Sequence, residues 1–86
     1  MTAEKLTEFC DNNISMCLGY ISGVSDLYSM LASVNPSIFN YCPPRSLTVL
    51  ELSSVYRREI RAFPPDPAAS AAARFTAILE RMYPCK

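Results

Sequence analysis

Four cysteines in a chain of 86 residues constrain the fold more than any other feature of this sequence. An even number of cysteines in so small a chain suits two disulfides, and therefore an oxidising compartment. On one continuous helix, Cys10 and Cys17 would lie about 10.5 Å apart, too far to bridge, but the Asp-Asn-Asn break at residues 11–13 makes this pair feasible. We prefer Cys10–Cys17 with Cys42–Cys85. Four cysteines allow three connectivities, however, and free buried thiols are a further alternative.

Length and composition indicate one small globular domain covering residues 1–86. Half of the residues are hydrophobic, and eight acidic side chains balance eight basic ones. Without a basic excess, we expect the protein to bind neither nucleic acid nor a membrane surface. The uncharged run of residues 12–25 is polar and contains two glycines, so it is not a membrane span. Because histidine and CxxC pairs are absent, we expect no zinc or other metal and no cofactor.

The stretch from Cys17 to Leu31 has the spacing of an amphipathic α-helix, which we expect to run from about residue 14 to residue 33. Gly19 and Gly23 lie one turn apart beside its apolar stripe, and each glycine costs a helix about 1 kcal/mol relative to alanine. We therefore expect another helix to pack closely against both glycines. The stripe predicted to be buried is Cys17, Tyr20, Ile21, Val24, Leu27, Tyr28 and Leu31, with Ser22, Ser25, Asp26 and Ser29 turned away.

Two further helices are predicted before residue 64. Residues 3–11 form a short first helix, and a T-x-x-E capping box of Thr48 and Glu51 opens another, which Pro64-Pro65 ends. Arginines crowd the last turns of this helix, where complementation of the helix dipole is the favoured interpretation and a binding patch the alternative. The inward faces are predicted to comprise Leu6, Phe9 and Cys10, then Leu52, Val55, Tyr56, Ile60 and Phe63, and the arginines are Arg57, Arg58 and Arg61.

A last helix is predicted to start with Asp66 at its N-cap and Pro67 at its first position. Its N-terminal half is nearly all alanine, so it could approach Gly19 and Gly23 closely. No strand pattern competes anywhere in the sequence. The predicted fold is therefore all-α, a compact bundle of four to five short helices stapled by two disulfides. The buried face of the last helix is expected to be Ala68, Ala71, Ala72, Phe75, Ile78, Leu79 and Met82.

The sequence offers no catalytic constellation. Without histidine, the usual general base is missing, and no cysteine has a histidine to activate it. The carboxylates suit helix caps and helix surfaces better than an acid–base pair. We therefore expect a protein that is not an enzyme.

Several short motifs follow one another in a characteristic order. C-x-G-Y-I-x-G-V-x-D covers residues 17–26, and Cys42-Pro43, the T-x-x-E opening, a Phe-Pro…Pro-Ala-Ala stretch at residues 63–69 and a terminal Tyr-Pro-Cys come after it. In this order, and with the four-cysteine frame, the chain from Leu6 to Cys85 resembles the Rap/Tai family. These are the immunity proteins against type VI secretion amidase effectors.

The resemblance implies a periplasmic, helical, disulfide-bonded protein without catalytic activity that is often a homodimer. Family members bind a toxic peptidoglycan amidase and block its active-site cleft, typically with a projecting loop, and so protect the producing cell and its siblings. Residues 1–5 lack the features of a signal peptide, so a periplasmic location implies that a leader has been removed. The resemblance marks as structural positions Cys10, Cys17, Cys42, Cys85, Gly19, Gly23 and Asp26.

The residues that would contact a partner are predicted from physical arguments. Residues 34–45 form a loop, because three prolines and two asparagines leave no room for a regular element. The loop carries apolar and aromatic side chains of the kind that anchor interfaces, although the aromatic ones could instead cap the core. The turn at residues 63–66 is a second candidate, but its prolines also have a helix-stop explanation. The predicted contact residues are Asn35, Ser37, Ile38, Phe39, Asn40 and Tyr41.

Two alternatives belong to other functional classes. A small periplasmic chaperone of the acid-stress type would expose apolar surface when its carboxylates are protonated at low pH. A homodimeric structural protein would use the apolar loop as its self-interface.

Overall fold

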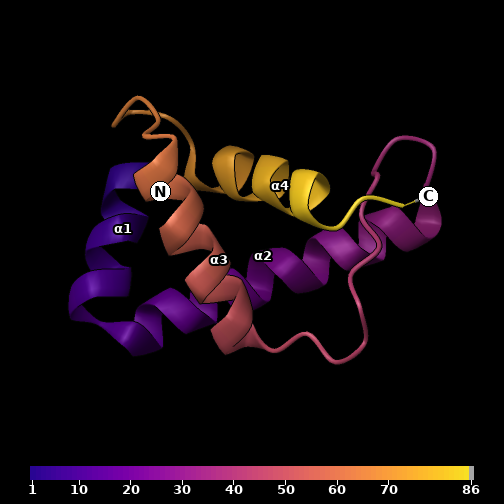
Figure 1. Ribbon diagram of the computed structural model, residues 1–86, viewed down its shortest axis with the longest axis horizontal. Coiled ribbons are helices and arrows are strands. Elements are labelled where there is room, and N and C mark those ends of the chain that lie inside the picture. The colour runs from indigo at the N-terminus through magenta and orange to yellow at the C-terminus, as the bar shows by residue number, and fades with distance from the viewer. Residues whose placement is uncertain (86) are drawn as a thin grey trace.

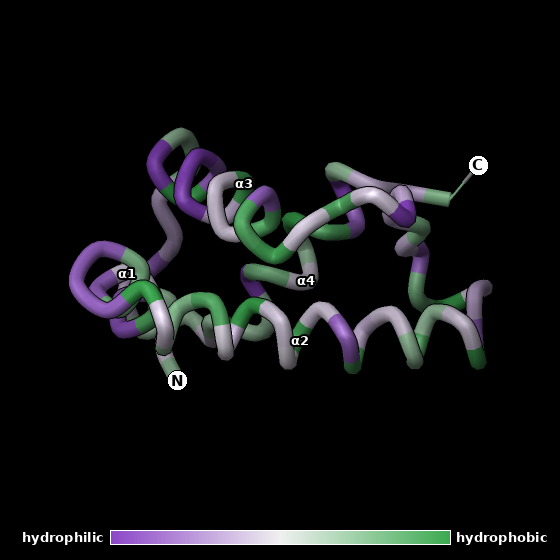
Figure 2. Tube along the Cα trace, turned by 90° about the horizontal axis from the view of Figure 1, so that it is seen from below, coloured by the Kyte–Doolittle hydropathy of each residue, from purple (hydrophilic) through white to green (hydrophobic). Residues whose placement is uncertain are grey.

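A long central helix organises the molecule (Figure 1). The computed structural model describes residues 1–85, and this part of the chain contains four α-helices and no strand. Helix α2 (Ile14–Val34) is about 32 Å long. The other helices, α1 (Ala3–Asn12), α3 (Val49–Ala62) and α4 (Ala71–Met82), pack against it and against one another. Figure 1 shows all three on the same side of α2, and in Figure 2 α1 lies beside one end of it. The predicted all-α fold is confirmed.

Each helix begins at a polar side chain that accepts a hydrogen bond from a free backbone N–H of the first turn. In α3 this is the predicted T-x-x-E pair: Glu51 N donates to Thr48 Oγ1 at 3.1 Å, and the Thr48 hydroxyl donates to the Glu51 carboxylate, also at 3.1 Å. Asn13 ends α1 and opens α2, which confirms the predicted break between the first two helices. The four N-cap residues are Thr2, Asn13, Thr48 and Ser70.

The predicted start of the last helix is wrong, because α4 begins at Ala71. Asp66 caps a turn instead, accepting a hydrogen bond from Ala68 N at 2.8 Å. The chain beyond that turn is extended, and Thr2 and Ser70 form an antiparallel bridge. The pairing includes a 2.8 Å hydrogen bond from Ala3 N to Ala69 O. It uses backbone groups that would have to form hydrogen bonds within α4 if this helix began earlier.

One hydrophobic core lies between the four helices, but α2 is rotated from its predicted orientation. Ser25, expected to face outward, is only 7% exposed, whereas Leu27, expected to be buried, is 55% exposed. Two other predictions are also corrected: Phe63 is 56% exposed where α3 ends, and Phe9 is only partly buried. The largest fully buried side chains are Leu6, Cys17, Ile21, Tyr56, Phe75 and Leu79.

Gly19 and Gly23 do not receive a neighbouring helix, so this prediction is wrong as well. Both are exposed, and a Cβ added at either position would have no heavy atom within 4 Å apart from its immediate surroundings in the helix. Neither glycine has a positive φ. Their place in the helix is thus not explained by packing or by backbone conformation within residues 1–85.

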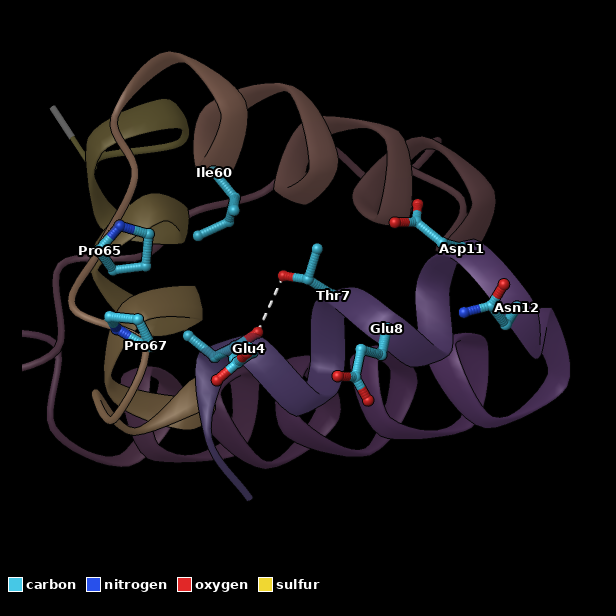
Figure 3. Close-up of a pocket in the computed structure, with 9 residues that line it drawn as sticks. Glu4, Thr7, Glu8, Asp11, Asn12, Ile60, Pro65 and Pro67 are labelled. Carbon is cyan, nitrogen blue, oxygen red and sulfur yellow. Dashed lines mark hydrogen bonds between the residues drawn. The ribbon is translucent and has the colours of Figure 1, made fainter.

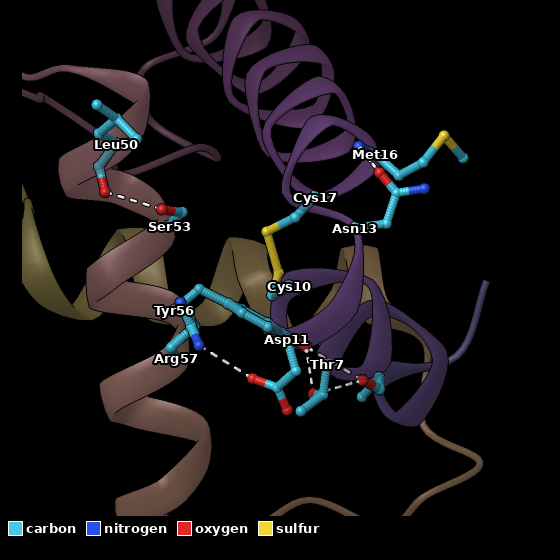
Figure 4. The surroundings of a disulfide bond; sticks show 11 residues. Thr7, Cys10, Asp11, Asn13, Met16, Cys17, Leu50, Ser53, Tyr56 and Arg57 are labelled. Atoms are coloured by element: carbon cyan, nitrogen blue, oxygen red, sulfur yellow. Dashed lines mark hydrogen bonds and ion pairs between the residues drawn. A yellow bond between two sulfur atoms is a disulfide. The ribbon is translucent and has the colours of Figure 1, made fainter.

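The two preferred disulfides are both present. Cys10–Cys17 joins α1 to α2 with Cα atoms 4.7 Å apart, and Cys42–Cys85 joins the α2–α3 connection to the C-terminal tail with Cα atoms 5.0 Å apart. Figure 4 shows the first disulfide facing Tyr56 of α3. Nearby, Arg57 of α3 forms an ion pair with Asp11 of α1 at 3.0 Å, so one face of α3 closes over the α1–α2 junction.

Candidate functional site

The loop predicted to bind a partner leaves α2 through a tight turn. Asn35 closes the helix by donating its N–H to Leu31 O at 2.9 Å, and its side-chain oxygen accepts a hydrogen bond from Ser37 Oγ at 3.0 Å. Ile38 N donates back to Asn35 O at 3.2 Å. The side chain of Ile38 is 65% exposed, which makes it the most exposed apolar group of the loop.

Both aromatic residues of the loop fold back onto the core. Tyr41 is only 3% exposed, and its hydroxyl shares a hydrogen bond with Ser25 Oγ at 3.3 Å. Phe39 is partly buried and packs edge-on against Tyr28, with ring centroids 5.6 Å apart. Tyr41 also lies against Tyr28 and Tyr83. Of the two alternatives for the aromatic side chains, the structure thus shows the one in which they cap the core, while Ile38 and its polar neighbours remain exposed.

The other end of the loop is tied to α4 and the tail. Asn40 N donates to the Glu80 carboxylate at 3.0 Å, and Asn40 Oδ1 accepts a hydrogen bond from Cys85 N, also at 3.0 Å. Cys42 N donates to Tyr83 O at 2.8 Å, next to the Cys42–Cys85 disulfide. With these contacts and the aromatic packing, the exposed turn is held by groups from α2, α4 and the tail.

Two phenols of the aromatic cluster beneath the loop, Tyr28 and Tyr83, have raised pKa values. Burial, together with the nearby carboxylate of Glu80, raises the pKa of Tyr28 to about 12. Burial likewise raises the pKa of Tyr83. Tyr28 and Tyr83 therefore stay protonated and uncharged at the pH of any ordinary compartment.

A second exposed feature, which the sequence interpretation missed, is the outer face of α2. Met16, Leu27, Met30 and Val34 are all exposed there and recur at helical spacing on the side where Gly19 and Gly23 lie. Asp26 is the only charged side chain of α2, and it is exposed at the edge of this face. These residues form a second apolar stripe in the sequence, but the stripe predicted to be buried is sufficient to explain a helix, so the second stripe does not by itself indicate a site.

An acidic groove lies along α1, between this helix and Ile60, Pro65 and Pro67 (Figure 3). It measures about 300 Å³, and carboxylates of α1 face Ile60, Pro65 and Pro67 across it. Two of these carboxylates already have partners: Glu8 pairs with Lys5 at 3.5 Å, and Asp11 pairs with Arg57. These are surface ion pairs, and nothing in the groove arranges them as an acid and a base.

Within residues 1–85, no three His, Cys, Asp or Glu side chains are grouped so that they could hold a metal ion. No helix in the same range combines the length and the hydropathy needed to cross a membrane.

Comparison with known proteins identifies the family. No curated protein and no solved structure was found to match the chain. The family model of the Rap1a immunity proteins, in contrast, matches residues 2–85, which includes every helix and all four cysteines. The chain therefore belongs to the Rap1a immunity protein family.

Proposed function

We propose that this protein is a periplasmic immunity protein that binds and inhibits a type VI secretion peptidoglycan amidase effector, and so protects the producing cell and its siblings. The observation that carries the proposal is the family match over residues 2–85. The two disulfides support an oxidising compartment such as the periplasm. The lack of histidine throughout the sequence favours a stoichiometric inhibitor over an enzyme.

Inhibition is proposed to come from the turn around Ile38 entering the active-site cleft of the amidase. Ile38 is the exposed apolar side chain of the loop, and Ser37 and Asn40 beside it are exposed polar groups. Because the turn is fixed by the disulfide, the Asn40 contacts and the aromatic cluster, little conformational entropy is lost when it binds. A preformed loop of this kind favours tight binding by a small surface.

The outer face of α2 is proposed to mediate a homodimer. This face is apolar along the helix and carries a single charge. Charged residues are depleted at the core of protein interfaces, so this composition suits an interface. Gly19 and Gly23 leave its middle flat, so two copies of α2 could approach closely. The loop would then remain free for the effector, because Ile38 lies beyond the end of α2.

The proposed function is tested with the secreted amidase encoded nearest to this chain. The oxidised, tagged protein should co-purify with that amidase and abolish its cleavage of peptidoglycan at an equimolar ratio. An absence of complex together with undiminished hydrolysis would remove this amidase as the target. Client binding induced by low pH would instead support the chaperone alternative.

The role of the loop is tested with Ile38→Asp. A charge in place of this side chain should weaken inhibition by at least about tenfold, because an apolar anchor in a desolvated cleft is replaced by a carboxylate. Ile14→Asp is the matched control, since Ile14 is also an exposed isoleucine but lies at the far end of α2. Equal inhibition by the two variants would contradict the assignment of the loop.

A further inference from the structure

A groove beside α4 combines two arginines with an exposed aromatic ring. It measures about 290 Å³ and is lined by Phe63 at the end of α3 and by four residues of α4. These four recur at steps of three, one and three, so they share one face of the helix. They are Arg74, Ala77, Ile78 and Arg81.

Helix α4 carries both the groove and a contact to the loop that the proposed function assigns to inhibition. Glu80, which precedes Arg81 in α4, accepts the hydrogen bond from Asn40 N. One helical turn thus carries both a contact that anchors the loop and an arginine of the groove. A partner that covers the turn around Ile38 could contact the groove as well by extending along α4.

The positive charge of the groove is only partly balanced by the protein. Arg81 pairs with Glu59 and lies over the ring of Phe63, 4.9 Å from its centroid. Arg74 forms no ion pair with any residue in the range 1–85, and its buried Nε has no hydrogen-bond partner there. Glu59 is shared by Arg81 and Arg58, whereas Arg74 has no carboxylate partner among the described residues. A buried donor without a partner is costly and uncommon.

Arg74 also lies close to the core. Its side chain is partly buried, and it lies near the phenol of Tyr56. Burial raises the pKa of Tyr56, while the hydrogen bond with Thr7 and the charge of Arg74 act in the opposite direction. Because its side chain is already partly buried, Arg74 loses less side-chain entropy on binding an anion than a fully exposed arginine would.

We infer that this groove, formed by Arg74, Arg81 and Phe63, is a second contact site that receives a carboxylate side chain from the surface of the effector. A planar guanidinium binds a carboxylate through two parallel hydrogen bonds, and arginine and aromatic residues are the usual anchors of interfaces. The exposed ring of Phe63 offers apolar contact beside the charge. The inference rests on the proposed function.

The size of the loop supports a second contact. A stable interface buries about 800 Å² on each partner and involves roughly 20–30 residues a side, which a single turn with one exposed apolar side chain does not supply. The charge pattern favours this groove over the groove along α1 for an acidic partner, because the groove along α1 is lined by carboxylates and would repel one. An effector that presents its carboxylate at α4 is thereby fixed in orientation.

The test uses the variants Arg74→Glu and Arg74→Gln, the second being the milder change. It measures how tightly each variant binds the amidase encoded nearest to this chain and how strongly it inhibits that enzyme. Arg74→Glu should weaken binding by at least about tenfold, and Arg74→Gln by less. Arg61→Glu is the matched control: it makes the same charge change at an exposed arginine in the last turn of α3, outside the groove, and should alter the affinity by no more than about threefold. Circular dichroism checks that each variant folds. If Arg74→Glu does not fold, the affinities of Arg74→Gln and Phe63→Ala are compared with that of the wild type instead.

The outcomes separate this inference from the proposed function. A tight wild-type complex with a loss specific to Arg74 and Phe63, and with a smaller salt dependence for Arg74→Gln than for the wild type, supports the groove. A tight wild-type complex in which the Arg74 variants behave like Arg61→Glu overturns the groove and leaves the proposed function standing. If the wild-type protein does not bind the amidase, the proposed function fails for that amidase and the inference fails with it.

Discussion

At the scale of single residues, the hydrogen bond between Ser25 and Tyr41 determines which way α2 faces. A buried hydroxyl without a partner is unfavourable, so Ser25 is tolerated in the core only because Tyr41 reaches it from the loop. In turn, the phenol of Tyr41 can be buried among aromatic rings because Ser25 satisfies it. The orientation of the helix and the position of the loop are therefore coupled through one pair of side chains.

We predict that Tyr41→Phe lowers the free energy of unfolding by about 2 kcal/mol, because it leaves the Ser25 hydroxyl buried without its partner. Ser25→Ala should have a similar cost. The double variant should lose less than the sum of the two single losses, since removal of both hydroxyls leaves no unpaired group. Urea denaturation of the three variants measures the coupling. Strictly additive losses would contradict the role given to this pair.

At the scale of the element, α2 has two apolar faces, and only one of them faces the core. Its periodicity was sufficient to predict a helix and its approximate ends. It could not distinguish a stripe centred on Leu27 from one centred on Ser25, because both contain apolar residues at the same spacing. The deciding interaction comes from Tyr41, sixteen residues away in the loop, and no local pattern records it.

If the outer face of α2 forms a dimer, Leu27→Glu should convert the protein to a monomer, because two like charges would meet near the centre of the interface. Leu50→Glu, at an exposed leucine of α3, is the matched control and should leave the oligomeric state unchanged. Sedimentation equilibrium at several concentrations gives the dissociation constants. A wild-type protein that is monomeric at every concentration would refute the proposed dimer.

At the scale of the whole molecule, the two disulfides close loops of very different length. Cys10–Cys17 closes a short loop between consecutive helices, with a sequence separation of 7 residues. Cys42–Cys85 has a separation of 43 residues and encloses both α3 and α4. A crosslink that closes a longer loop restricts the unfolded chain more strongly.

Replacement of Cys42 and Cys85 by serine should therefore lower the free energy of unfolding by about 4 kcal/mol, compared with about 2.5 kcal/mol for the same change at Cys10 and Cys17. Guanidinium denaturation of the two double variants makes the comparison. The first variant should also inhibit the amidase less well, because the turn around Ile38 loses its tether. A larger loss of stability for the Cys10–Cys17 variant would show that local packing outweighs loop closure.

The parts of the structure that were predictable from sequence are those encoded locally. The capping box of α3, the break at Asn13 and the ends of α2 follow from short motifs. The start of α4 does not, because it is set by pairing of Ser70 with Thr2 at the other end of the chain. The candidate site divides in the same way: the loop was identified from its composition, whereas the groove requires Phe63 and Arg74 to be brought together by the fold.

The Cys42–Cys85 disulfide also determines whether a single proteolytic cut can release a fragment of the protein. The segment at residues 63–69 is largely exposed and joins α3 to α4 inside the ring that this disulfide closes. A single cut there would leave the two pieces covalently linked, with α4 still attached through Cys85 to the loop at Cys42. A nicked molecule would thus keep its helices at the high effective concentration of a tethered pair. Release of a fragment would need a second cut or reduction of the disulfide.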